Sequence, residues 1–144
     1  MKTSTRFFAL VTLLLVCSTL HPQTDPILTF VTTLNPKTAT QIVFEPTGVL
    51  DLTYWNQEHI SLTIHVESNG LRREQVKALV PLGLFKLETT VEGSKLLINM
   101  PGLERGLLIN GNEVIWQLRY VMKSPNTIQV VRKNAAAPTH SNLD

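Results

Sequence analysis

The feature that most constrains this chain is an alternation of apolar and polar residues with a period of two. It is clearest in residues 59–67, HISLTIHVE, where every second residue is apolar. Successive side chains of a β-strand point to opposite faces, so this stretch would place one face on a core and the other in water. The same alternation in residues 50–54 and 114–122 predicts two further strands. Such a pattern predicts a mainly β protein.

Weaker alternation brings the expected total to about eight or nine short strands. The additional segments are residues 27–34, 41–45, 85–91, 96–100, 107–109 and 127–131. Turn residues separate most of them, and Asn110-Gly111 is the strongest hairpin signal because asparagine and glycine tolerate positive φ. The expected fold is a small β-sandwich or a short β-solenoid-like domain.

One stretch, LRREQVKALV, breaks the alternation. Its apolar residues recur at helical spacing, and Pro81 and Gly83 follow it. This predicts a single short helix near residues 71–80. We expect the helix to cover part of the sheet, because a helix of this length is marginal alone in water.

The amino terminus has the pattern of a secretory signal peptide. Lys2 and Arg6 precede the apolar run FFALVTLLLVCSTL, and this arrangement is typical of a cleaved export signal. The run is shorter than the roughly 20 apolar residues of a spanning helix. We therefore expect residues 1–23 to be removed, with cleavage between Thr19 and Thr24, and the mature chain to have no integral membrane span.

Cys17 is the only cysteine. Its place at the end of the apolar run raises the alternative of a lipoprotein signal ending in a lipid anchor at Cys17, although Val16 does not match the small residue usual before such a cysteine. In both cases the folded part has no disulfide. We expect one β domain over residues 24–132 and a disordered tail over residues 133–144.

Charge argues against a nucleic-acid partner. The chain has 13 Lys and Arg residues against 11 Asp and Glu. Because Lys2 and Arg6 fall in the predicted signal, the mature chain is close to neutral. Nucleic-acid binding needs a basic footprint, so we expect no nucleic-acid partner.

Two histidines in one short stretch raise the question of a metal site. His59 and His65 would share a strand face, but a strand rises about 3.3 Å per residue, which separates them by roughly 20 Å. Zinc ligands lie within about 2.1 Å of the metal. We therefore expect no metal and no cofactor.

Enzyme chemistry finds little local support. The sequence has no G-x-S-x-G elbow, which is the sign of many serine hydrolases. Asp51, Glu88 and Glu92 could in principle supply a carboxylate pair for glycoside chemistry, but carboxylates at turns are common. The expectation is a protein without catalytic residues; a periplasmic hydrolase or carbohydrate-active enzyme is the alternative.

A contact surface is a simpler role for the polar strand faces. Trp55 follows Tyr54, and because neighbouring strand residues point to opposite faces, one of the two should point outward. Trp55, His59 and His65 are therefore the candidate contact residues, for an envelope protein or for a glycan. The competing interpretation is that the helix or the first strand covers Trp55.

Two segments resemble a known family. Residues 42–66, IVFEPTGVLDLTYWNQEHISLTIHV, pass from a strand through a glycine-centred turn to a short strand ending in tryptophan and then an alternating strand. Residues 119–131, RYVMKSPNTIQVV, lead through a proline-containing step into a valine-rich strand. Both resemble adhesin-type β domains of bacterial envelope proteins.

The resemblance covers residues 39–69 and 114–131. It implies a β-solenoid-like winding, export to the periplasm or cell surface, and no catalytic residues. The helix near residues 71–80 and the small number of strands depart from the family's pattern, which keeps the sandwich open. The combined expectation is an exported, non-catalytic, adhesin-like interaction module of the bacterial envelope.

Overall fold

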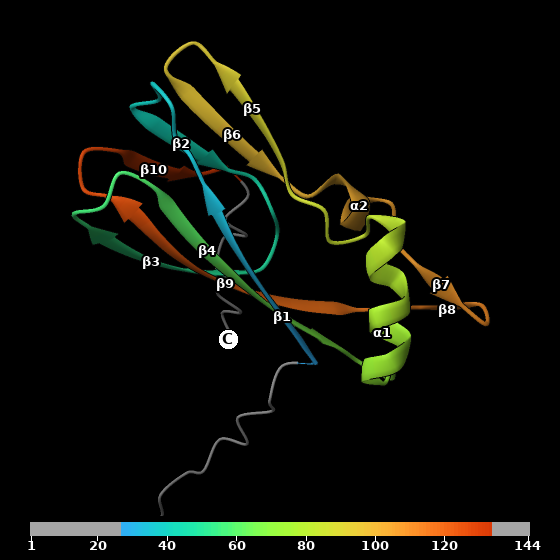
Figure 1. The fold of residues 1–144 in the computed structure, drawn as a ribbon. Coiled ribbons are helices and arrows are strands. Elements are labelled where there is room, and N and C mark those ends of the chain that lie inside the picture. The colour runs from blue at the N-terminus through green and yellow to red at the C-terminus, as the bar shows by residue number, and fades with distance from the viewer. Residues whose placement is uncertain (1–26, 134–144) are drawn as a thin grey trace, which may run out of the picture.

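The computed structural model of the chain describes residues 27–133. In this part of the chain, ten strands form two four-stranded sheets and one small hairpin, accompanied by short helices (Figure 1). The predicted signal, Cys17 and the predicted tail from residue 134 onward lie outside the described residues. The expectation of a mainly β fold is confirmed.

Sheet A has the strand order β1-β4-β9-β3. Its strands are β1 (Leu28–Leu34), β3 (Val49–Trp55), β4 (Ile60–Ser68) and β9 (Trp116–Pro125). β4 is antiparallel to both of its neighbours, whereas β3 runs parallel to β9. The alternation that predicted β4 is confirmed, since its inward face is buried through Ile60, Leu62, Ile64 and Val66.

Sheet B has the strand order β10-β2-β6-β5. Its strands are β2 (Gln41–Phe44), β5 (Glu88–Glu92), β6 (Lys95–Asn99) and β10 (Gln129–Arg132). β2 is parallel to both β10 and β6, and β5 and β6 form an antiparallel hairpin. The chain passes repeatedly between the two sheets, for example from β1 to β2 and from β9 to β10.

The two sheets pack face to face over one apolar core. The rings of Phe44 on β2 and Tyr120 on β9 meet edge to face with centroids 4.9 Å apart. Both residues are fully buried, as expected where the inner faces of two sheets interdigitate. The sandwich expectation is therefore confirmed and the solenoid-like alternative is wrong: both sheets are open, and apart from the β5–β6 hairpin their neighbouring strands come from distant parts of the sequence.

The helical elements lie at one end of the sandwich. They are α1 (Arg73–Leu79), a 3₁₀ turn (Val80–Leu82) and the one-turn α2 (Pro101–Glu104), followed by the hairpin of β7 (Leu108–Ile109) and β8 (Asn112–Glu113). α1 confirms the predicted helix and buries Val76. Among the described residues no helix has the length and apolar character to cross a bilayer.

One expected strand is wrong in its bounds. Residues 85–91 were expected to form one strand, but β5 begins only at Glu88. Phe85 instead packs its ring against Phe30 and Trp116, with centroids 5.6 and 5.1 Å away. Leu52 and Tyr54, which alternate on one face of β3, are 36% and 48% exposed, because β3 is an edge strand of sheet A.

Candidate functional site

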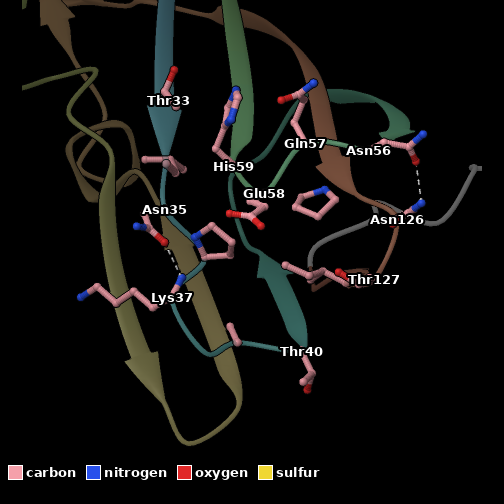
Figure 2. A pocket seen from close by; sticks show the side chains of 15 residues that line it. Thr33, Asn35, Lys37, Thr40, Asn56, Gln57, Glu58, His59, Asn126 and Thr127 are labelled. Atoms are coloured by element: carbon pink, nitrogen blue, oxygen red, sulfur yellow. Dashed lines mark hydrogen bonds between the residues drawn. The ribbon is translucent and has the colours of Figure 1, made fainter.

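Three loops meet at the end of the sandwich away from α1 (Figure 1). They form a cleft of about 850 Å³, whose lining side chains are drawn in Figure 2. They are the β1–β2, β3–β4 and β9–β10 connections. Each loop begins where a strand of sheet A ends, and two of them cross to sheet B. The ends of the strands therefore fix the position of the cleft.

Hydrogen bonds between the loops hold their relative positions. The backbone N–H of Asn126 donates to the carbonyl of Trp55 over 3.0 Å, and its side-chain Nδ2 donates to Oδ1 of Asn56 over 2.8 Å. The N–H of Gln129 donates to the carbonyl of Thr40 over 3.1 Å. The three loops are thus linked to one another, and a ligand would meet a site whose backbone is already ordered.

The β1–β2 loop owes its shape to a local turn. Oδ1 of Asn35 accepts a hydrogen bond from the N–H of Lys37 over 2.8 Å, as asparagine commonly does with the backbone two residues later. Lys37 itself has a positive φ of 53°. In Figure 2 the ammonium group of Lys37 points away from the other labelled side chains. The turn therefore places the amide of Asn35 at the cleft, while the side chain of Lys37 points outward.

The cleft lining is rich in amides and hydroxyls and has little net charge. The charged side chains that line it are Lys37 and Glu58, together with the imidazole of His59. Its amides and hydroxyls come from Asn35, Asn56, Gln57, Asn126, Thr33, Thr40 and Thr127 (Figure 2). Amides and hydroxyls both donate and accept hydrogen bonds. This lining suits a neutral, polar ligand better than a strongly charged one.

Two of the three predicted contact residues lie together beside this cleft. The rings of Trp55 and His59 meet edge to face with centroids 4.8 Å apart, and the indole N–H donates to the carbonyl of His59 over 2.9 Å. His59 lines the cleft, whereas Trp55 is not among the lining residues and has Nζ of Lys123 5.6 Å from its ring centroid. Trp55 therefore supports His59 and is half-buried.

His65, the third predicted contact residue, is not part of the cleft lining. It lies on the outer face of sheet A, where its Nδ1 is 3.2 Å from the hydroxyl of Thr29 on β1. His59 precedes the first residue of β4, and His65 lies six positions further along the chain. Within residues 27–133, no group of three or more His, Cys, Asp or Glu side chains is placed to hold a metal ion.

The carboxylates considered for glycoside chemistry do not converge. Asp51 lies on β3 and forms a 2.6 Å ion pair with Arg119 of β9. Glu88 and Glu92 lie on β5, in the other sheet. Glu58, which the sequence did not single out, is the carboxylate that lines the cleft.

The amides of the cleft were recognised in the sequence only as turn residues. Asn35-Pro36 and Asn56-Gln57 mark expected turns, and Asn126 lies in the proline-containing step of residues 119–131, but nothing in the local pattern shows that these segments meet. The side-chain amides that these residues share were the one sequence feature that could have pointed to the cleft.

Comparisons of this chain with protein-family models, with curated proteins and with solved structures found no match.

Proposed function

We propose that this chain is an exported, non-catalytic interaction module of the bacterial envelope, and that its loop cleft binds a neutral, hydroxyl-rich ligand such as a glycan. The observation that carries the proposal is a cleft of about 850 Å³ whose polar lining consists mainly of amides and hydroxyls, with one acidic and one basic side chain. The lining also includes the apolar residues Leu34, Pro36, Ala39, Pro125 and Ile128. Export and an adhesin-like role come from the sequence pattern of residues 1–23 and from the resemblance to adhesin-type domains.

The charge of the lining favours a neutral glycan over other small ligands. A strongly anionic ligand would be expected to meet several cations, but Lys37 is the one lysine or arginine among the described residues that line the cleft. An apolar ligand would cover Nδ2 of Asn56 and Oδ1 of Asn126, which the hydrogen bond between these two side chains does not use, and burying polar groups without partners costs free energy. Sugar hydroxyls can instead satisfy them.

The composition of the cleft also favours binding without catalysis. Most glycoside hydrolases use two carboxylates that flank the scissile bond. Among the described residues lining the cleft, Glu58 is the one carboxylate, and no serine or cysteine is present there to act as a nucleophile. A hydrolase would therefore need groups from outside this lining.

Titration calorimetry of the purified chain with neutral hexasaccharides of glucose and of N-acetylglucosamine tests the proposal. We expect at least one to bind and to be recovered intact. Asn126→Ala removes a cleft amide and should weaken binding about fivefold to thirtyfold, the equivalent of one or two neutral hydrogen bonds.

Asn112→Ala is the matched control, because Asn112 is an exposed asparagine on β8, outside the cleft. It should bind like the unmodified chain. Equal losses in both variants, or no binding of either sugar at millimolar concentration, would contradict the glycan proposal. Release of shorter sugars during the titration would favour the hydrolase alternative.

A further inference from the structure

The outer edge of β1 is a strand edge without a partner among the described residues. β1 is the terminal strand of sheet A, and β4 is its one neighbour in that sheet. Figure 1 shows β1 along the front of the molecule. At its midpoint, Val31 is 72% exposed, so no described segment covers this position. The edge is open to a strand from another chain.

The hydrogen bonds of sheet A identify the backbone groups on this edge. The N–H of Asn69 donates to the carbonyl of Ile115, which extends the antiparallel ladder of β4 and β9. Bonded and non-bonded pairs alternate in such a ladder, so the even-numbered residues of β4 direct their backbone groups toward β1. The carbonyl of Val66 also faces β1, since it accepts a hydrogen bond from the N–H of Ile27, which precedes the strand. In the register of the two strands Leu28 lies opposite Val66, so from Leu28 onward the even-numbered residues of β1 face β4. The outward backbone groups of β1 therefore belong to Thr29, Val31 and Thr33.

The other sheet edges carry charges, and β1 does not. β5 has Glu88 and Glu92 at its two ends. β3 carries Asp51, and β10 has only four residues and ends at Arg132. Charged side chains and short strands are common protections against unwanted pairing. The seven residues of β1, LTFVTTL, contain neither charge nor proline.

We propose that β1 pairs with the β1 strand of a second copy of this chain, antiparallel and centred on Val31. A two-fold axis at this residue sets Val31 opposite the partner's Val31, and Thr29 opposite the partner's Thr33. Each of these pairs joins residues whose backbone groups point outward, so each exchanges two hydrogen bonds. In this dimer the two copies of sheet A form one continuous sheet. The proposed dimer does not depend on which ligand the cleft binds.

Side-chain chemistry supports a second copy as the occupant. Val31 lies beside Thr63 of β4 on the outer face, so the residues nearest the two-fold axis in this row are uncharged in both copies. Residues 60–66 of β4, opposite β1, include no Lys, Arg, Asp or Glu. Like charges directly opposite one another destabilise strand pairs, and this register has none.

The expected dimer is weak. Stable interfaces bury about 1,200–2,000 Å² in total, and one pair of short strands falls below this range. Association should therefore depend on concentration. Sedimentation velocity of the purified chain from about 10 μM to 1 mM measures this dependence, and we expect a shift from monomer to dimer within the range.

Val31→Lys tests the register, because it places two ammonium groups at the two-fold axis while the exposed side chain leaves the core unchanged. The dissociation constant should rise at least tenfold. Val49→Lys is the matched control: Val49 is also on sheet A, 58% exposed, and lies on β3 at the opposite edge. It should dimerise like the unmodified chain, and both variants should keep the circular dichroism of the folded protein.

A cross-linking experiment provides an independent readout. In a Cys17→Ser chain, Val31→Cys should form a disulfide-linked dimer under a mild oxidant, because directly opposite residues of a bonded pair have Cα atoms about 5.5 Å apart. Val49→Cys should cross-link far more slowly. A chain that stays monomeric up to 1 mM, or equal behaviour of the paired variants, would overturn the proposal. A complex with a different protein that Val31→Lys abolishes would assign the edge to that protein instead.

Discussion

Gly48 is a residue whose replacement should affect the whole fold. It lies immediately before β3 with a φ of +129°, a conformation that side chains disfavour. A Cβ atom at this position would lie 2.5 Å from the carbonyl oxygen of Leu118 and 3.0 Å from the ring of Tyr120. Glycine is therefore required here both by backbone conformation and by close approach to β9.

We predict that Gly48→Ala destabilises the chain by about 2–4 kcal/mol, since strain and a backbone clash act together. Urea denaturation followed by circular dichroism measures the free energy of unfolding. Gly93→Ala is the control: its φ is also positive, at 60°, but its Cβ would meet no atom within 4 Å. It should cost about 1 kcal/mol, and equal losses in the two variants would contradict the close approach at Gly48.

The burial of the Tyr120 phenol allows a prediction of how the stability of the chain responds to alkaline pH. Its side chain is fully buried against Phe44, and its hydroxyl has no hydrogen-bond partner within the described part of the chain. Burial raises the pKa of the Tyr120 phenol, an effect that the nearby charge of Arg132 partly offsets. In the unfolded chain the phenol ionises near pH 10. The folded state therefore keeps its proton at a pH where the unfolded state loses it.

Below pH 10 the Tyr120 phenol is protonated in both the folded and the unfolded state, so the folded state has its full stability. Above pH 10 stability is lost as the pH rises, because the unfolded state is deprotonated more readily and is therefore favoured. We predict that the unmodified chain loses free energy of unfolding relative to Tyr120→Phe between about pH 10 and pH 11.5. Near pH 7 the variant should be neutral or slightly more stable, since an unpaired buried hydroxyl is removed. Parallel denaturation curves at all pH values would contradict a raised pKa.

At the scale of single elements, the alternating pattern was most reliable in strands with neighbours on both sides. β4 and β9 are the inner strands of sheet A, and in both the apolar face predicted from sequence is the buried one. In β3 the same pattern places Leu52 and Tyr54 on one face, yet Tyr54 on that face is 48% exposed. Alternation shows which residues share a face, but it does not show whether the strand lies at the centre or the edge of a sheet.

The elements missed by the sequence depend on tertiary contacts. α2 is a single turn that begins at Pro101, a favoured residue for the first helical position. Gly102 of α2 lies close to the backbone of Leu84, since a Cβ atom at Gly102 would be 2.5 Å from the carbonyl oxygen of Leu84. Phe85 likewise leaves the expected strand because its ring has Phe30 and Trp116 to pack against. No local pattern contains these partners.

At the scale of the whole molecule, the cleft is a product of topology. Asn35, Asn56 and Asn126 are distant in the sequence, and they meet because three strands of sheet A end on the same side of the sandwich. The sequence marked the turns at Asn35 and Asn56 and only a proline-containing step at Pro125, but the order of strands in the sheets decided which of these segments became neighbours. Strand order in this fold follows from repeated crossings between the sheets, which local periodicity does not encode.

The shared core makes a final prediction about cooperativity. Because Phe44 of sheet B and Tyr120 of sheet A pack against each other in one buried cluster, neither sheet can lose its partner without exposing its inner face. We therefore predict that both sheets unfold in one two-state transition, as most small domains do.

The two tryptophans report on this transition from opposite ends of sheet A. Trp55 lies beside Pro125 at the last residue of β9, and Trp116 is the first residue of β9. Trp116→Phe leaves Trp55 as the fluorescent reporter next to the cleft, and Trp55→Phe leaves Trp116 next to Phe85. In each variant the urea midpoint from fluorescence should coincide with that from far-UV circular dichroism, because one core supports both ends. A cleft reporter that changes at lower urea than the dichroism would show that the loop end unfolds separately, and a rigid, preordered cleft would then be untenable.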